Sequence, residues 1–584
     1  MLVSSRLSRQ LQAIAGFILL YAVLLLVTRN SYHQLVLTLI PIWATLGLSW
    51  NLLSGNSGLI SFGQASFFGL GAYTVTLLLV WFDITPWIGI PAAVVVGMIA
   101  AAIIGYPSFR LRGYYFALTM LAYPLALLNI FEWLGLQEVT LPMKREAPAA
   151  FMQFADQRVY ALLALGMLVL ALLVSLAVER TRFGLSLLAI KQNEQAAEAA
   201  GIPTFAWKMR AIVVSGGMAA AAGGLYAVVL LVVTPDTVFG LLTSAQALIF
   251  TMFGGVGTVW GAVVGAVVLI PLSESIRSAL ADVLPGVQGV VYGLAIILTM
   301  FIAPEGIIWR IRDARQRAPA PLTPPPPRPM VAAHPAGHEA ELLRVEGLSK
   351  RFGGLMAVDD VSFSVPEGRV LGIIGPNGAG KTTLFNLLNG FAAPSAGRVR
   401  FAGRDLVGLK PNRICKLGIG RTFQVVRPFA RMSVLQNVAI GAFVAEPDAS
   451  SSIAAAWEAL ARVGLQDAAH RIAGGLTTKE LRLMELARAL AARPRLLLMD
   501  ETLAGLGADE ADEISEVIRR LPQDGTTVVI IEHTMRAMLR LADDFLVLDH
   551  GRVLASGRPE DVVRDKAVIE AYLGKKWMTA HAED

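Results

Sequence analysis

The sequence predicts a chain of more than one domain, in which an all-α, multi-pass membrane domain is followed by a soluble α/β domain. Of its 584 residues, 55% are hydrophobic and only 16% are charged, against ~25% charged in an ordinary soluble domain. Long apolar runs fill the chain up to residue 309, whereas charges occur throughout 342–584. The second part also contains short apolar runs typical of buried strands, one of them followed by apolar residues at helical spacing.

Composition excludes several classes of protein. The hydrophobic content excludes a disordered chain and argues against an ordinary soluble enzyme. Fifty basic and 44 acidic residues leave a net charge of +6, which is too small to indicate a nucleic-acid partner. Cys415 is the only cysteine in the sequence, so an intrachain disulfide and a cysteine-only zinc site are excluded. We interpret Cys415 as a reduced thiol without chemistry.

A proline-rich stretch separates the two parts. We expect a membrane domain at 1–309, a cytoplasmic linker at 310–341 and a soluble domain at 342–584. A proline run favours extended polyproline conformation at ~3.1 Å per residue, which suits a tether. A proline-rich motif that binds a partner protein is the alternative.

The first part contains about eight to ten candidate spans. A hydrocarbon core of ~30 Å requires about 20 helical residues. Further spans follow the first one, which is therefore not interpreted as a cleaved signal peptide. The candidates are 13–28, 35–53, 59–81, 87–105, 114–134, 159–178, 209–233, 242–270 and 287–303.

Lysine and arginine placement predicts the topology. Arg6 and Arg9 place the N-terminus inside, and six spans return the chain inside at 179–208, which is basic. The soluble domain must also lie inside, because it carries the nucleotide motifs described below. An even number of crossings must therefore separate residue 208 from residue 310, yet the pattern gives three.

The motif FGGVG at 253–257 offers an explanation for the odd count. It either divides 242–270 into two half-helices that re-enter the membrane, or shows that the count is wrong by one. A glycine patch for tight helix packing is the alternative.

Polar side chains inside the spans are costly in lipid, so we expect them to face the interior of the helix bundle. Most should join helices by hydrogen bonds, and a minority should line a substrate path. The candidates are Asn51, Ser61, Gln64, Asn129, Gln246 and Thr251.

The soluble part contains a phosphate-loop motif. VLGIIGPNGAGKTTLF fits GxxxxGK[ST] with Gly375, Gly380, Lys381 and Thr382, between a strand pattern and a helix pattern. Backbone N–H groups of such a loop cradle phosphate oxygens, while the lysine neutralises β/γ-phosphate charge and the hydroxyl binds Mg²⁺. ATP and Mg²⁺ are thus the expected cofactors. The expected nucleotide-binding residues are Gly375, Pro376, Asn377, Gly378, Ala379, Gly380, Lys381, Thr382 and Thr383.

Two later strand patterns end in side chains suited to nucleotide hydrolysis. RLLLMDE places Asp500 at a strand end, where it can hold Mg²⁺, and Glu501 beside it as a general base. VVIIEHT places His533 after another strand. A histidine there can contact the γ-phosphate and hold Glu501 and the water in place. We therefore predict Lys381, Glu501 and His533 as catalytic residues.

With these motifs, 342–584 resembles the ATP-binding cassette of ABC transporters, a phosphate-loop NTPase fold. The resemblance implies that Gln424, in RTFQ, binds Mg²⁺ together with Thr382 and Asp500. It also implies that Phe352, in KRFGG, stacks on adenine. The tail VIEAYLG is similar to the ATPase of branched-chain amino acid importers.

The sequence departs from the family pattern at the signature. Leu476-Thr477-Thr478-Lys479-Glu480 occupies the place of an LSGGQ-like stretch, and both glycines are absent. The Thr477 hydroxyl and the Lys479 charge are candidate substitutes. Gly507 stands where Asp or Asn is usual, and Thr502 rather than proline follows Glu501.

The altered signature predicts asymmetry, because the family's sites are composite. Each nucleotide lies between one subunit's phosphate loop and the other subunit's signature. The site built on Lys381 should hydrolyse ATP with a partner's signature, whereas the site that uses this chain's signature should be impaired. A homodimer would carry the altered signature twice, so a heteromer is favoured.

The first part resembles the permeases of branched-chain amino acid importers. The resemblance rests on LGLSWNLLSGNSGLISFGQASFFGLGAYT at 46–74 and on the stretch at 187–227. It implies that the polar segment 192–204 couples the permease to the ATPase. Glu198-Ala199-Ala200-Gly201 predicts a short helix within this segment that ends at the glycine.

Together these resemblances imply a fused permease–ATPase subunit of an importer in the bacterial inner membrane, surrounded by lipid. Its cargo is expected to be a branched-chain amino acid or a similar small polar solute. The implied partners are a second permease, a second ATP-binding subunit and a periplasmic binding protein, with no nucleic acid. An ABC exporter and a non-transporting regulatory subunit are the alternatives.

Overall fold

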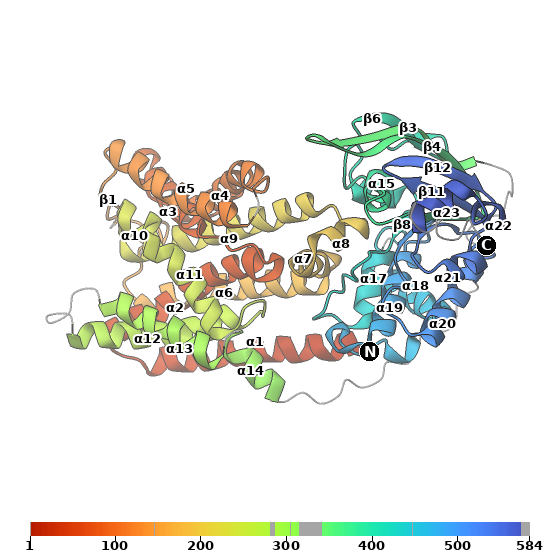
Figure 1. Ribbon diagram of the computed structural model, residues 1–584. Coiled ribbons are helices and arrows are strands. Elements are labelled where there is room, and N and C mark those ends of the chain that lie inside the picture. The colour runs from red at the N-terminus through yellow and green to blue at the C-terminus, as the bar shows by residue number, and fades with distance from the viewer. Residues whose placement is uncertain are drawn as a thin grey trace. The chain divides into compact units, whose positions relative to one another are not determined.

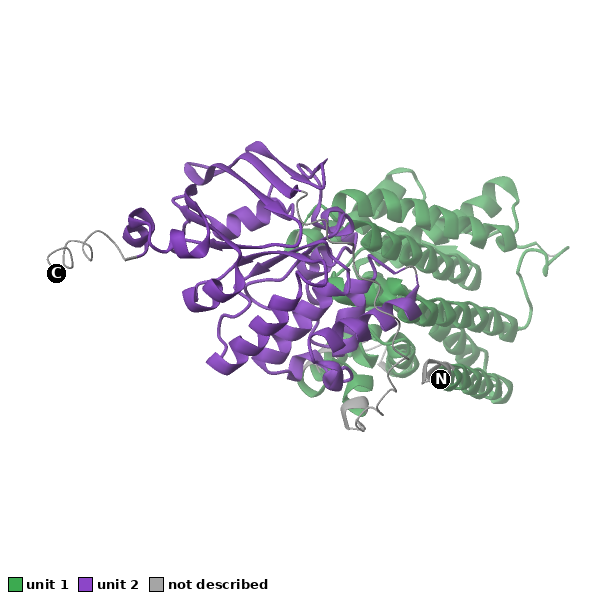
Figure 2. Cartoon of the chain, turned by 90° about the vertical axis from the view of Figure 1, so that its right-hand side faces the viewer, with its two compact units in different colours: residues 1–191, 205–318 green, residues 192–204, 319–584 purple. Residues whose placement is uncertain are grey.

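The computed structural model describes residues 2–111, 113–144, 146–280, 287–303, 305–314, 341–446 and 448–573. The chain divides into two compact units (Figure 2). The helical unit comprises residues 1–191 and 205–318, and the α/β unit comprises residues 192–204 and 319–584. Most of the expected linker, from residue 315 to residue 340, lies outside the described residues.

The helical unit consists almost entirely of long apolar helices. Among the described residues, nine helices are long and apolar enough to cross a membrane, and α13 is a shorter apolar helix. The helices are α1 (Leu2–Val27), α2 (Ser31–Trp50), α3 (Gln64–Phe82), α4 (Pro86–Ser108), α5 (Tyr114–Trp133), α6 (Gln157–Arg180), α7 (Arg182–Gln192), α9 (Thr204–Leu230), α10 (Pro235–Phe239), α11 (Leu241–Gly254), α12 (Gly261–Leu280), α13 (Val287–Ile302) and α14 (Ile307–Ala314).

Helix α2 is the most buried of these helices. It packs against α6, α11 and α12 and continues as a π-helical turn, Asn51–Gly55. A short antiparallel pair of strands, β1 (Val139–Thr140) and β2 (Val232–Val233), joins two of the loops.

The structure has two helices over 242–270, so of the two explanations given for the odd count it supports a count that was wrong by one. Helix α11 ends at Gly254 and α12 begins at Gly261, and both are long enough to cross a membrane, the first of them together with α10. Gly255 and Gly257 have φ values of +142° and +75°, which side chains other than glycine rarely adopt. Among the described residues, three of the long apolar helices begin at or after Thr204, and the shorter apolar helix α13 brings the number to four, the even number that the predicted topology requires.

The polar residues predicted to face the bundle interior divide into two groups. Asn51, Ser61, Gln64, Gln246 and Thr251 are buried. By contrast, Asn129 on α5 is exposed and donates only to Leu125 O of its own helix, at 2.7 Å.

The α/β unit has two sheets with helices around them (Figure 1). A four-stranded antiparallel sheet has the order β4-β3-β6-β7, from β3 (Glu341–Phe352), β4 (Leu355–Pro366), β6 (Ala396–Phe401) and β7 (Arg404–Asp405). A six-stranded sheet has the order β12-β11-β5-β10-β9-β8, from β5 (Val370–Ile374), β8 (Ile419–Arg421), β9 (Leu496–Asp500), β10 (Thr527–Ile531), β11 (Asp544–Asp549) and β12 (Arg552–Gly557).

Helices cover both faces of the larger sheet. The helices of this unit are α8 (Glu194–Ala199), α15 (Lys381–Leu388), α16 (Pro411–Lys416), α17 (Val434–Ala442), α18 (Ala449–Arg462), α19 (Thr478–Leu490), α20 (Ala508–Arg520), α21 (Met535–Leu541), α22 (Pro559–Val562) and α23 (Lys566–Leu573).

The central strands of the larger sheet are buried on both faces. Every residue of β5, β9 and β10 is buried, as expected for parallel strands covered by helices. In β10, Val528 and Ile530 join one hydrophobic cluster, while Val529 and Ile531 join the other. Since β5, β10 and β9 are parallel neighbours, the segments that follow them meet at one edge of the sheet.

Candidate nucleotide site

The phosphate loop, residues 375–380, joins β5 to α15, and glycine is required at two of its positions. Gly375 and Gly380 have φ values of +151° and +96°. A Cβ atom on Gly375 would lie 2.1 Å from Leu548 O, and one on Gly380 would lie 2.3 Å from Ala357 O. The backbone can therefore curve tightly ahead of the α15 N-terminus, whose N–H groups suit phosphate oxygens.

Lys381 bends back over this loop. Its Nζ donates hydrogen bonds to Gly375 O at 2.7 Å and to Pro376 O at 2.9 Å. Burial lowers the pKa of Lys381, and the nearby charges of Glu501 and Asp500 oppose that shift. The ammonium group is thus held at the loop that the sequence predicts to bind phosphate, with Thr382 exposed beside it.

Glu501, Gln424 and His533 form one cluster at the sheet edge. Glu501 Oε1 lies 2.7 Å from His533 Nε2, and Glu501 Oε2 accepts a hydrogen bond from Gln424 Nε2 at 2.8 Å. Glu501 has a φ of +49°, a strained backbone conformation of the kind found at functional sites. The structure therefore brings the predicted base together with His533, which was predicted to hold it, and with Gln424, which was predicted to bind Mg²⁺.

Asp500 is the last residue of β9 and is buried. Its two carboxylate oxygens differ in their hydrogen-bond partners. Asp500 Oδ2 lies 3.3 Å from Nη2 of Arg421. Asp500 Oδ1 is buried and has no hydrogen-bond partner among the described residues. Burial raises the pKa of Asp500, and the Arg421 charge opposes that shift.

These oxygen atoms fit a magnesium ion. An unpartnered buried carboxylate oxygen is costly unless a cation or water meets it, and Mg²⁺ prefers carboxylate, hydroxyl and water oxygens. The predicted ligands Thr382 and Gln424 are exposed and supply a hydroxyl and an amide carbonyl. Thr382 follows Lys381, which lies near the charge of Asp500. Gln424 bonds to Glu501, the neighbour of Asp500. Within the part of the chain that the structure describes, no group of three or more His, Cys, Asp and Glu side chains could hold a metal by itself.

Phe352 ends β3 at the tip of the β3–β4 hairpin. It pairs with Leu355 across the turn, and its side chain is 51% exposed. Two residues beyond Leu355, Ala357 O faces Gly380 of the phosphate loop. The hairpin therefore leads from this aromatic ring to the loop, an arrangement compatible with the predicted stacking on adenine.

The altered signature lies at the N-terminus of α19. Thr477 caps the helix, where its Oγ1 accepts from Glu480 N at 3.3 Å and its N–H donates to Glu480 Oε2 at 2.9 Å. Lys479 forms an ion pair with Glu513 of α20. The hydroxyl and the charge predicted as substitutes for the missing glycines are thus engaged inside this unit.

Sequence reasoning missed the charged residues that hold the segment 423–427. Glu485, buried on α19, accepts from the N–H groups of Phe423 and Arg427, both at 3.3 Å. On the same helix face, Arg482 donates to Phe423 O at 3.0 Å and Gln424 O at 2.9 Å, and Arg488 donates to Arg427 O at 2.8 Å. The signal was available in the sequence of α19, where charged residues recur at 479, 482, 485 and 488, and the residues between 482 and 488 are otherwise apolar.

Glu532, beside His533, is a second buried acid at the site. Its Oε1 accepts a hydrogen bond from Leu503 N at 2.6 Å. Burial, with a smaller effect of the Glu501 charge, raises its pKa to about 7. Glu532 thus fixes the backbone just after Glu501.

The helix expected within 192–204 is present as α8 and belongs to the α/β unit. Asn193 caps its start and Gly201, with a φ of +85°, follows its end. Gln192 Oε1 accepts from Arg431 N at 2.7 Å, and Gln195 hydrogen-bonds to Arg427. Arg427 therefore touches α8 with its side chain while its backbone is held by α19.

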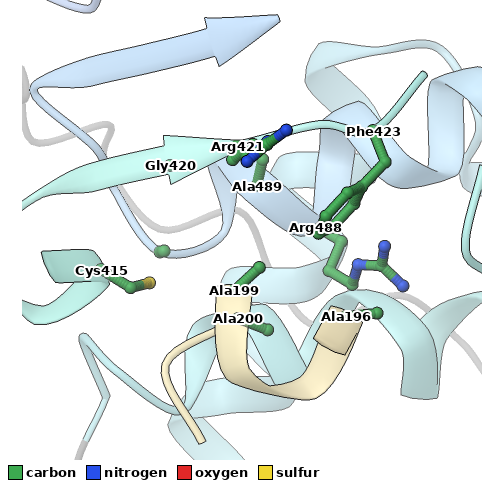
Figure 3. Close-up of a pocket in the computed structure, with 10 residues that line it drawn as sticks. Ala196, Ala199, Ala200, Cys415, Gly420, Arg421, Phe423, Arg488 and Ala489 are labelled. Atoms are coloured by element: carbon green, nitrogen blue, oxygen red, sulfur yellow. The ribbon is translucent and has the colours of Figure 1, made fainter. Parts of the chain in front are cut away.

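A cavity lies between α8 and the segment around β8 (Figure 3). Ala196, Ala199 and Ala200 line it from α8, and Arg421 and Phe423 line it from the β8 side. Cys415 also lines it, and burial raises the pKa of this thiol to about 12. Small side chains let α8 approach the sheet closely.

Comparison with known protein families matches both parts of the chain. Residues 33–300 match the permease component of branched-chain amino acid transport systems. Residues 358–504 match the ABC transporter family, and residues 552–576 match the branched-chain amino acid ATP-binding cassette transporter family.

Among curated proteins, the chain is similar to ATP-binding proteins of high-affinity branched-chain amino acid transport. BraF of Pseudomonas aeruginosa is 38% identical over 252 residues, which cover 40% of this chain and 98% of BraF. LivG of Escherichia coli K12 is 37% identical over the same coverage. A crystal structure of an ABC-transporter cassette in its ADP conformation is 35% identical, with a TM-score of 0.38, and covers 40% of this chain and all of that one.

Proposed function

The chain belongs to the branched-chain amino acid ABC transporter family, with permease and ATP-binding cassette in one polypeptide, and from that premise we propose its place in a complete transporter. It is the fused subunit of an importer in the bacterial inner membrane. Its partners are a second permease, a second ATP-binding subunit and a periplasmic substrate-binding protein. The cargo is a branched-chain amino acid or a similar small polar solute.

The observation that carries this proposal is the position of α8. Its sequence lies between two helices of the permease-family segment, 33–300, yet α8 packs against α16 of the cassette. Through Gln195 it contacts Arg427, three residues from Gln424, and Gln424 holds Glu501. A movement at the nucleotide can thus reach the permease sequence through a short series of contacts.

The chemistry follows from the cluster at the sheet edge. The loop N–H groups and Lys381 bind the phosphates, and Glu501 accepts the proton of the attacking water. His533 and Gln424 hold the two oxygens of Glu501, which fixes the direction in which the carboxylate faces. Mg²⁺, when bound by Thr382, Gln424 and Asp500, neutralises charge on the β- and γ-phosphates.

The two composite sites of the assembled transporter are unequal. The site that contains Lys381 and Glu501 hydrolyses ATP when a partner supplies a glycine-rich signature. The site completed by Thr477 and Lys479 of this chain is impaired, because those side chains are engaged by Glu480 and Glu513. Equal trapping of nucleotide on both ATP-binding chains would contradict this asymmetry.

The experiment is uptake of labelled leucine, isoleucine and valine by cells that lack this chain and are complemented with variants. The wild-type chain should restore uptake, and Glu501→Gln should not, at equal expression in the membrane. Purification of the chain from its native membrane in mild detergent should recover the proposed partners. Restored efflux rather than uptake would indicate an exporter, and full uptake with Glu501→Gln would indicate a regulatory subunit.

A further inference from the structure

Arg421 is a buried cation that the chemistry described above does not use. Its side chain and that of Asp500 are only 3% and 1% exposed. Arg421 Nη1 donates to Asn386 Oδ1 at 2.8 Å, and Asn386 lies on α15, the helix that begins at Lys381. The rings of Phe385, Phe391 and Phe423 lie 6.0, 5.5 and 5.2 Å from its guanidinium carbon.

We infer that Arg421 is a positioning residue that orients Asp500 for Mg²⁺. We also infer that this orientation depends on how α8 packs against the cavity that Arg421 lines. The inference rests on the proposed function, because it assigns α8 the coupling role and Asp500 the metal. Arg421 thus joins the residues of the nucleotide site. It also connects α8 to the metal through contacts that do not include Gln424.

The orientation of Asp500 follows from the unequal surroundings of its two oxygens. The terminal torsion of an Asp side chain is broad, so a carboxylate without a fixed partner samples many directions. Arg421 engages Oδ2, which leaves Oδ1, buried and without a hydrogen-bond partner among the described residues, as the oxygen presented to the metal. Because Arg421 is itself fixed by Asn386 and three aromatic rings, it holds Oδ2 rigidly.

Lysine cannot reproduce this arrangement. A guanidinium presents donors in a planar fork, one arm to Asn386 and one to Asp500, whereas an ammonium is a compact group on a flexible stem. Partners that orient a metal-binding carboxylate typically change metal affinity or activity by about 10–100-fold when lost. Arg421→Lys keeps the charge and removes the fork.

The dependence on α8 follows from where Arg421 lies. Arg421 and its neighbours Gly420 and Phe423 line the cavity that Ala196, Ala199 and Ala200 close from the side of α8 (Figure 3). Arg421 therefore lines the cavity next to α8 and also pairs with the carboxylate of Asp500, which is predicted to bind the metal. Side chains larger than alanine on this face of α8 should displace the wall and, with it, Arg421.

The test measures nucleotide on this chain directly, in the purified transporter reconstituted in lipid nanodiscs. Azido-ATP photolabelling in EDTA reports binding without the metal, and labelling at graded MgCl₂ gives the half-saturating Mg²⁺ concentration. The labelled chain is identified on a gel by its mass of 62.5 kDa. Arg421→Lys should raise the half-saturating Mg²⁺ concentration about tenfold and leave labelling in EDTA within twofold of wild type.

Arg495→Lys is the matched control. Arg495 lies at the other end of β9, pairs with Glu367 at 2.9 Å and lies 6.0 Å from the Phe401 ring. Arg495→Lys therefore disrupts an arginine–carboxylate pair beside β9, at the end of the strand away from Asp500. The inference is overturned if Arg421→Lys binds Mg²⁺ like wild type, or if Arg495→Lys shifts the Mg²⁺ dependence equally.

A double-mutant cycle tests the link to α8. Ala199→Leu should raise the half-saturating Mg²⁺ concentration in the wild-type chain and add little in the Arg421→Lys background. Additive shifts would remove the link, and Ala199→Leu without any shift would do the same. A wild-type chain without Mg²⁺-dependent labelling would instead contradict the proposed function itself.

Discussion

His533 Nε2 lies 2.7 Å from Glu501 Oε1, although 32 residues separate the two in the sequence. The strands that precede them, β9 and β10, are parallel neighbours in register from Leu496 with Thr527 to Asp500 with Ile531. The contact is therefore a direct result of the sheet order. We propose that His533 fixes the direction of the predicted base through this contact.

His533→Ala should lower the ATPase rate less than Glu501→Gln does. Loss of a general base typically costs about 10²–10⁴-fold, whereas a misplaced base costs about 10–100-fold. In His533→Ala, Gln424 still holds the other oxygen of Glu501. Steady-state phosphate release by the reconstituted transporter measures both rates. Equal losses in the two variants would show that His533 does more than orient Glu501.

Glu532 should make the cassette less stable as the pH rises. Its pKa is raised from 4.5 to about 7 in the folded chain, so the folded state holds the proton more tightly than the unfolded state. The stabilisation is complete below pH ~4.5 and is lost as the pH rises through ~7, a change on the order of 3 kcal/mol.

The Glu532→Gln variant tests this pH dependence, since it keeps an acceptor for Leu503 N and cannot ionise. Its unfolding temperature in detergent should fall less than that of wild type between pH 5 and pH 8. Glu516→Gln on α20, where the carboxylate is half exposed, is the control and should follow wild type. Parallel curves for wild type and Glu532→Gln would contradict the prediction.

Restoring the glycines of the signature should raise hydrolysis at the impaired site. Thr478→Gly with Lys479→Gly costs about 1 kcal/mol of helix propensity and breaks the ion pair with Glu513. It leaves Thr477 as the cap and opens the backbone to a γ-phosphate. Vanadate-trapped nucleotide on the partner's ATP-binding chain should increase. No increase at equal assembly would show that the altered signature is not what limits that site.

The sequence predicted the residues whose chemistry follows a strand. Lys381, Asp500, Glu501 and His533 could be assigned because parallel strands end at the same edge of a sheet. Arg421 and Glu485 could not, because the bonds that give them a role join residues 79 and 62 positions apart. The break between α11 and α12 was underestimated for a different reason: hydropathy stays high through a glycine turn, so a window over 242–270 gives one span.

Asn51 should be needed for transport more than for ATP hydrolysis. It begins the π-helical turn after α2, where its Oδ1 accepts from Gly257 N at 2.7 Å and its Nδ2 donates to Thr258 O at 2.9 Å. Both bonds end on the turn between α11 and α12, so one side chain joins α2 to that turn. At the end of the π-helical turn, Gly55 O accepts a hydrogen bond from Lys191 Nζ at 2.7 Å. Lys191 directly precedes the segment 192–204.

Asn51→Leu removes both hydrogen bonds, each worth about 0.5–1.5 kcal/mol, and leaves the half-buried Gly257 N without its acceptor. ATP hydrolysis should stay within about twofold of wild type, because the cassette is unchanged, whereas uptake should fall at least tenfold. Asn129→Leu is the matched control, since Asn129 is exposed and bonds only to its own helix. Equal loss of uptake in both variants, or loss of ATP hydrolysis with Asn51→Leu, would show that the joint is merely structural.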